Sequence, residues 1–191
     1  MLRILVPAGR TNNLIRNPDN SKRRNSVRRI THSTVLAAGL FYWLSSVWVV
    51  SPEAVLYPEG YRRWTHVKSA IIGPGNPAYA RFGGLHHIYA NDKAMEGYRN
   101  GQFPDGSVIV ADFLETQTTK EDVTSAGPRR LIDVMHKDHK RFPETGGWGF
   151  EEFRGDSRTE RTVGQQRAKT DCYNCHAGRK EQDFVFSSFR E

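Results

Sequence analysis

Short apolar, β-prone runs recur along the chain from residue 66 onward, and turn residues separate them. Five of these runs predict β-strands: His66–Ile72, Leu85–Ala90, Ser107–Leu114, Arg130–Lys137 and Trp148–Arg154. One short helix is expected at Lys93–Asn100, where Asn91 or Asp92 provides the cap. Strands that follow one another in hairpin-like succession with few helices predict an α+β fold, built on an antiparallel sheet of about five strands.

A different pattern precedes the strands. Residues 34–50 form an uncharged, mostly apolar run behind the pair Arg28-Arg29, which is typical of an export signal. The run is shorter than the ~20 residues that a membrane-spanning helix prefers. A cleaved signal peptide and a retained membrane anchor therefore both stay open. Either one places residues 51–191 in the periplasm or facing it, behind a basic and disordered region at residues 1–33.

The net charge of +7 changes this picture only at the N-terminus. Residues 1–33 hold eight Lys or Arg and one Asp, whereas residues 51–191 hold 20 basic and 20 acidic residues. The globular part therefore has no net positive field to attract phosphate, and no nucleic-acid partner is expected. With 37% hydrophobic and 11% aromatic residues overall, the chain can bury a core.

Candidate chemistry lies near the C-terminus, where the chain's two cysteines, Cys172 and Cys175, are followed directly by His176. This C-x-x-C-H spacing is the attachment signature of c-type haem. Two thiols on one turn of helix can each form a thioether with a haem vinyl group, and the adjoining imidazole can ligate the iron. A disulfide, a redox-active pair and a zinc site are alternatives, although zinc would need two further ligands from distant residues. We therefore expect one covalent haem c, with His176 as the metal ligand.

Aromatic and glycine motifs occur in a fixed order around this signature. They are Tyr61–Trp64, Leu85–Asp92, Phe103–Gly106, Gly146–Phe150 and Asp183–Phe186. Together with the C-x-x-C-H, they resemble the cytochrome P-460 family, which includes the cytochromes c′-beta, over roughly residues 57–190. The resemblance implies an antiparallel sheet, a homodimer and a single haem c whose distal side faces the sheet. It also implies a redox partner cytochrome and a small nitrogen-oxide or hydroxylamine ligand.

The resemblance further implies which residues face the haem. Hydroxylamine-oxidising members carry a lysine, cross-linked to the haem, on the strand that follows the Phe103–Gly106 turn. The matching position here is Ala111, and the family's distal arginine matches His86. Alanine has no amine with which to form the cross-link. Both departures therefore count against hydroxylamine oxidase activity.

Side-chain alternation along this strand predicts that Ile109, Ala111 and Phe113 share one face, toward the haem. Phe82 is expected to complete an apolar wall. Such a wall favours a five-coordinate iron that binds small neutral molecules such as NO. His86 is the candidate distal residue, which would hydrogen-bond a ligand or move protons. A purely structural histidine on the sheet is an equally good interpretation.

Two other functions stay open at this point. Hydroxylamine oxidation would need a cross-link from some residue other than Ala111. Simple electron transfer would need a sixth iron ligand from the protein, such as Met135 or His86. The charged run His136–Lys140 has the composition of a metal site, but a solvated loop is expected there.

Overall fold

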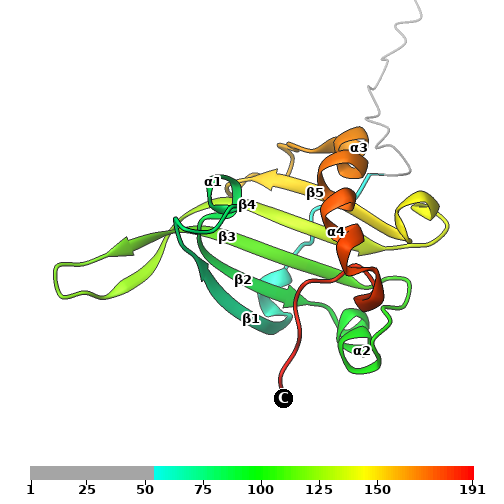
Figure 1. Cartoon of the computed structure of the whole chain (residues 1–191), viewed down its shortest axis with the longest axis horizontal. Helices are drawn as coiled ribbons and strands as arrows, with labels where there is room; N and C mark the ends of the chain where they lie inside the picture. The colour runs from blue at the N-terminus through cyan, green and yellow to red at the C-terminus, as the bar shows by residue number, and fades with distance from the viewer. Residues whose placement is uncertain (1–53) are drawn as a thin grey trace, which may run out of the picture. The chain divides into compact units, whose positions relative to one another are not determined.

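The computed structural model describes residues 54–191, so the predicted disordered region at 1–33 and the predicted signal peptide or membrane anchor at 34–50 lie outside the described part. At its centre is a five-stranded antiparallel sheet in which each strand pairs with the next one in the chain (Figure 1). The strands are β1 Thr65–Ile72, β2 Gly84–Ala90, β3 Val108–Thr118, β4 Thr124–Lys137 and β5 Trp148–Arg154. With a few short helices around it, the sheet confirms the predicted α+β fold.

Two strands are longer than predicted. β3 continues past Leu114 to Thr118, and β4 begins at Thr124 rather than at Arg130. The extra residues pair with one another and form an arm that projects beyond the sheet (Figure 1). The predicted ends were wrong because the apolar pattern stops there, whereas backbone pairing continues through exposed polar residues. Register shifts on either side of Leu114 separate the arm from the main sheet.

The two faces of the sheet are covered by different parts of the chain. The segment that contains the 3-10 helix η1 (Tyr61–Arg63) packs on one face with a small core. Its buried members are Val55, Tyr61, Val110, Ile132, Val134 and Phe153. The helix α2 (Asp92–Asn100), which Asn91 caps as predicted, and the C-terminal residues belong to a larger core. That second core contains Ile109, Met135, Trp148 and Phe150, so it lies against the other face.

A buried carboxylate fastens the N-terminal segment to the sheet. Asp112 on β3 is fully buried and accepts a hydrogen bond of 2.7 Å from the Tyr61 hydroxyl. The Arg129 guanidinium on β4 donates to the same carboxylate at 2.6 Å and neutralises its charge. A buried charge needs such partners to offset the loss of water. Because Asp112 points to this face, its neighbours Ala111 and Phe113 point to the other one.

The cysteine motif lies in a helical rod that crosses the sheet (Figure 1). Four short elements follow one another without a break: α3 (Gly164–Arg167), a π-helical turn η3 (Ala168–Tyr173), α4 (Asn174–His176) and the 3-10 helix η4 (Ala177–Gln182). Cys172 therefore sits in the π-helical turn, and π-helical turns are frequent at functional sites. Among residues 54–191, no helix has both the length and the apolar character required to span a membrane.

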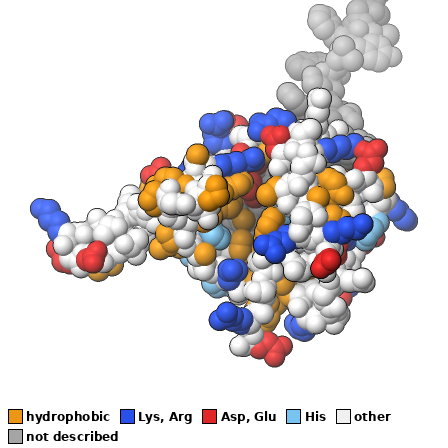
Figure 2. Space-filling model, in the orientation of Figure 1, with side chains coloured by type: hydrophobic (Ala, Val, Ile, Leu, Met, Phe, Trp, Pro, Cys, Tyr) orange, Lys and Arg blue, Asp and Glu red, His pale blue; other side chains and the backbone are white. Residues whose placement is uncertain are grey.

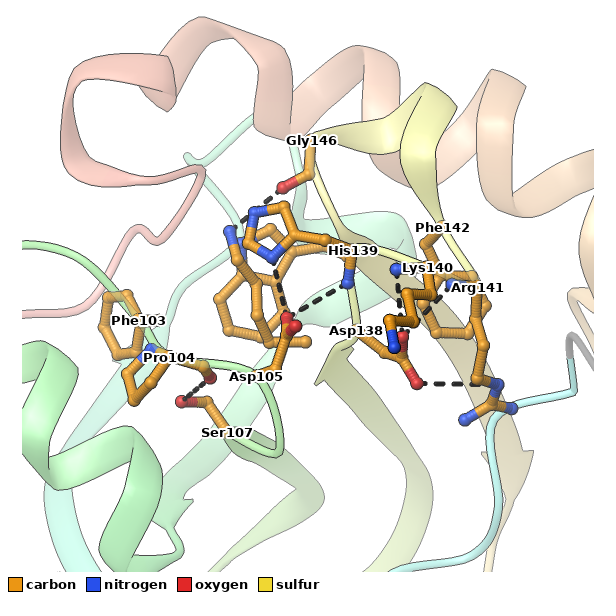
Figure 3. A network of polar contacts seen from close by, with 12 residues as sticks. Phe103, Pro104, Asp105, Ser107, Asp138, His139, Lys140, Arg141, Phe142 and Gly146 are labelled. Carbon is orange, nitrogen blue, oxygen red and sulfur yellow. Dashed lines mark hydrogen bonds and ion pairs between the residues drawn. The ribbon is translucent and has the colours of Figure 1, made fainter.

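The charged run His136–Lys140 was predicted to be a solvated loop, and only its part after the end of β4 at Lys137 is one. His139 is exposed, and both its backbone N–H (3.0 Å) and its Nδ1 (2.7 Å) contact the Asp105 carboxylate (Figure 3). Asp138 accepts from the backbone N–H groups of Lys140 and Arg141, so these charges shape a turn. Lys137 differs, because β4 carries its side chain inward to an exposure of 2%. Within the described residues, no three His, Cys, Asp or Glu side chains gather so that they could hold a metal ion.

Candidate functional site

A cavity of about 510 Å³ lies between the sheet and the C-terminal helical rod. Its volume falls in the range of about 300–1,000 Å³ that is typical of small-molecule and cofactor sites. All eight site residues predicted from the sequence line it: Phe82, His86, Ile109, Ala111, Phe113, Cys172, Cys175 and His176. Figure 2 shows hydrophobic side chains gathered between the projecting arm and the rod. The fold thus brings residues that lie more than 60 positions apart in the sequence into one apolar space.

The sheet side of the cavity follows from strand alternation. Ile109, Ala111 and Phe113 all face the cavity from β3, whereas Asp112 is held on the opposite face. Ala111 pairs with Ile88 on β2 and with Asp133 on β4, and both of these residues also line the cavity. The centre of this wall is therefore a methyl group flanked by one apolar and one acidic side chain.

Aromatic rings form the next part of the wall. Phe113 lies between Phe82 and His86, with ring centroids 5.2 Å and 5.3 Å away respectively. Phe82 ends the short helix α1 (Tyr79–Phe82), and His86 comes from β2. His87 points to the other face of the sheet, as alternation predicts, where its Nδ1 lies 2.6 Å from the Ser69 hydroxyl.

His86 carries a buried polar atom without a partner. Its Nδ1 has no hydrogen-bonding partner among the described residues, although it is shielded from solvent. Burial, followed by the nearby charges of Lys68 and His87, lowers the pKa of His86 below the ordinary value of 6.5. The imidazole is therefore neutral near pH 7 and can act as either donor or acceptor. A buried polar atom without a partner is costly, and a ligand in the cavity would relieve that cost.

On the rod side, His176 is oriented by a backbone carbonyl. Its Nδ1–H donates a hydrogen bond of 2.7 Å to the Phe184 carbonyl oxygen, which leaves the Nε2 lone pair available to a metal. Phe150 and Phe186 pack on the ring with centroid distances of 5.0 Å and 4.9 Å. Burial lowers the pKa of His176, so the ring is in the neutral form that binds metals.

The Phe184 carbonyl is itself held by a buried clamp. Asp183 adopts a left-handed backbone conformation with φ of 49°, and its carboxylate accepts from the Lys137 ammonium at 2.5 Å. The Phe103 backbone N–H donates to the other carboxylate oxygen at 2.8 Å. The Trp148 indole N–H donates to the Asp183 carbonyl at 2.9 Å. Three separate parts of the chain thereby fix the turn that orients His176.

The two thiols also face this cavity, Cys172 half-buried and Cys175 exposed. Burial raises the pKa of the Cys172 thiol to about 12, with Asp133 contributing in the same direction. A redox-active C-x-x-C pair instead depends on a lowered thiol pKa. The electrostatics therefore disfavour the redox-pair alternative. An apolar cavity with two thiols, an oriented imidazole and an unpartnered imidazole nitrogen fits a haem.

The cavity also has lining residues that the sequence analysis did not assign to it. The principal ones are Lys68, Arg81, Asp133, Met135, Phe150 and Phe186. Asp133 and Met135 alternate along β4 as Ile109 and Ala111 do along β3, so the same rule would have found them. From the sequence, Met135 is only a candidate sixth ligand of the iron. No sequence pattern connects Lys68 or Arg81 to the cysteines, and the folding of β1 and α1 alone brings them there.

Comparison with known proteins adds one finding. A family model described as Cytochrome P460 matches residues 58–187. The matched range contains all five strands, both cysteines and His176. No curated protein matches the chain at a significant level.

Proposed function

Because the chain belongs to the cytochrome P460 family and is thus a c-type haem protein, we propose that it holds one haem c in this cavity and binds a small nitrogen compound such as NO. One observation carries the proposal. The oriented imidazole of His176 and the methyl group of Ala111 line the same cavity, from the rod and from the sheet. The protein thus offers a metal ligand on the rod and no metal-binding side chain at the centre of the sheet wall.

Each lining residue has a definite task in this proposal. Cys172 and Cys175 would form the two thioethers, and His176 would hold the iron through Nε2 while its Nδ1–H donates to the Phe184 carbonyl. When bound, the haem would supply an iron that can bind a small ligand. Phe82 and Phe113 exclude water from that space. The neutral His86 imidazole supplies a hydrogen bond to whatever polar atom enters beside it.

The absorption spectrum of the purified ferrous protein, with and without NO, tests the open site. We expect a five-coordinate spectrum that changes on addition of NO or CO. A sharp six-coordinate low-spin spectrum that does not change when NO or CO is added would contradict the proposal. It would instead favour electron transfer, with Met135 or His86 as the sixth ligand. Haem staining of a denatured gel tests the thioethers, since a Cys172→Ser, Cys175→Ser double variant should lose the stain.

Hydroxylamine oxidation is a second candidate, and Lys68 is the observation in its favour. This lysine lines the cavity from β1, although Ala111 occupies the position of the family's cross-linking lysine. A cross-link from Lys68 would shift the ferrous absorption far to the red and change the mass of the denatured holoprotein. The Lys68→Ala variant should then lose both signals. Identical spectra for Lys68→Ala and wild type would leave NO binding as the better account.

The leader and the assembly state extend the proposal beyond the described residues. The basic residues before the apolar run at 34–50 support export, which places the haem domain in or facing the periplasm. N-terminal sequencing of the protein from membrane and periplasmic fractions would distinguish an anchor from a cleaved signal. The family resemblance supports a homodimer that exchanges electrons with a partner cytochrome. Light scattering of the purified holoprotein tests the dimer.

A further inference from the structure

An acidic corner of the cavity wall has no role in the function proposed above. Asp133 on β4 is the register partner both of Ala111 on β3 and of Glu152 on β5. Residues paired across antiparallel strands place their side chains on the same face. Asp133 therefore stands between the Ala111 methyl group and a second carboxyl group, and it lines the cavity. Glu152 lies behind it with an exposure of 9%.

Glu152 is held by hydrogen-bond donors on both of its carboxyl oxygens. The Arg81 guanidinium on α1 donates to one of its oxygens at 2.8 Å, and the Thr162 hydroxyl donates to the other. These two donors hold the Glu152 carboxyl group in place next to Asp133.

Asp133 responds to this neighbour. Its pKa is raised to about 8, first by burial and then by Glu152, through charge and a shared hydrogen bond, and by Glu151, while Arg81 opposes them. Two adjacent carboxyl groups in a water-poor site cannot both ionise readily, so one proton is shared between them. The other acids in the cavity lining are Glu151, which is ion-paired with Arg161 at 3.0 Å, and Asp171 in η3, which is ion-paired with Arg167 at 2.8 Å.

We propose that Asp133 and Glu152 form a proton-sharing pair that takes up one proton from water when the haem cavity gains one electron, and releases it when the electron leaves. The inference rests on the haem binding proposed above, but not on the identity of the small ligand. The electron comes from any one-electron donor and converts ferric to ferrous iron. The positive charge of the cavity then falls by one, and the Asp133 carboxylate becomes a carboxylic acid that donates to Glu152.

The sign of the pH dependence follows from this balance. The oxidised state carries one more positive charge, so it favours the ionised pair, and the reduced state favours the protonated pair. The midpoint potential should therefore fall as the pH rises between the pKa values of the two states, and level off outside them. The steepest possible slope is about 59 mV per pH unit, because a tenfold change in a one-electron equilibrium corresponds to that potential.

Redox titration of the holoprotein with mediators and without NO, over a pH series that brackets 8, tests the pair. Asp133→Asn and Glu152→Gln keep the size of the side chains and should flatten the slope. Asp171→Asn removes another acid from the cavity wall and should keep it. Redox-difference infrared spectra of the wild type should gain a carboxylic-acid carbonyl band on reduction, and Asp133→Asn should lose that band. If one of the two variants fails to fold, the other still gives the comparison.

Failure of the proton-sharing inference can be distinguished from failure of the proposed haem binding. A haem-containing protein whose potential has the same pH dependence in the wild type and in Asp133→Asn would overturn the inference alone. A purified protein without haem would overturn the proposed function, and the inference with it.

Discussion

The side chain of Ala111 ends at Cβ, so β3 presents a methyl group to the cavity where the hydroxylamine-oxidising members of the family are expected to present an amine. The neighbouring polar groups then decide what the cavity can do. His86 offers an unpartnered ring nitrogen, and Asp133 offers an exchangeable proton. They belong to different strands, β2 and β4, on either side of β3. Two single residues therefore place a hydrogen-bonding group beside Phe113 and a proton donor beside Ala111 in the same cavity wall.

Replacing His86 with phenylalanine tests the first of these groups. His86→Phe preserves the ring packed on Phe113 but removes both nitrogens. A hydrogen bond contributes about 0.5–1.5 kcal/mol net, and 1.4 kcal/mol corresponds to about a tenfold change in an equilibrium constant. We expect bound NO to dissociate up to about tenfold faster, as measured by stopped-flow ligand replacement. His87→Phe, on the opposite face, is the control, and equal rates for both variants would refute a role for His86.

At the scale of elements, the orientation of His176 depends on how separate segments meet at the turn after η4. β4 supplies Lys137, β5 supplies Trp148, and the segment before β3 supplies the Phe103 N–H. Close packing supports the same turn, since a Cβ on Gly146 would lie only 2.2 Å from the Phe184 ring. The imidazole is therefore held by tertiary contacts and not by the helical rod alone.

Removing the ammonium of Lys137 should destabilise the whole protein. Lys137→Met leaves the Gly146 carbonyl without its side-chain donor and the largely buried Asp183 carboxylate with only the Phe103 N–H and no positive partner. Breaking a buried ion pair from one side costs about 3–5 kcal/mol. The expected result in urea unfolding is a lower midpoint with an unchanged slope.

Lys140→Met, in the exposed part of the same turn, is the matched control. Surface substitutions usually change stability by less than about 0.5 kcal/mol. If the two variants unfolded at the same urea concentration, the buried clamp would have no energetic role.

At the scale of the molecule, the haem domain carries equal numbers of acidic and basic residues, while the excess positive charge lies at residues 1–33. The change in its free energy of unfolding with pH is therefore governed by buried titratable groups more than by repulsion between surface charges. Burial is the first cause of the lowered pKa values of His86 and His136, and Arg141 adds to it at His136. These rings resist protonation in the folded state, whereas they protonate normally in the unfolded chain.

The free energy of unfolding should accordingly fall as the pH drops below about 6.5, the ordinary pKa of histidine. The unfolded chain binds more protons in that range, so stability present above the unfolded pKa is lost as the pH falls through the folded pKa values. Urea unfolding at a series of pH values measures this. His136→Gln should make the decline shallower, and the exposed His66→Gln should not. A decline of equal steepness in wild type and His136→Gln would contradict this assignment.

The sequence predicted those features that depend on the spacing of residues along the chain. Consecutive apolar runs located the five strands. Side-chain alternation placed Ile109, Ala111 and Phe113 on the face of their strand that lines the cavity. The contiguous C-x-x-C-H motif placed two thiols beside an imidazole. These features depend on neighbours a few residues apart, whose relative directions are set by helix and strand geometry. Their spacing therefore carries the site's chemistry before any long-range contact forms.

Only the tertiary structure determined which distant side chains became neighbours. The register of β3, β4 and β5 puts Ala111, Asp133 and Glu152 in one row, and the folding of β1 brings Lys68 to the cavity. The same packing buried Lys137 within a run that looked solvated. Which charges become neighbours depends on strand register and on the closure of distant segments, and local periodicity contains neither. The haem attachment motif was therefore readable in the chain, whereas the proton-sharing pair and the clamp on His176 emerged only from the fold.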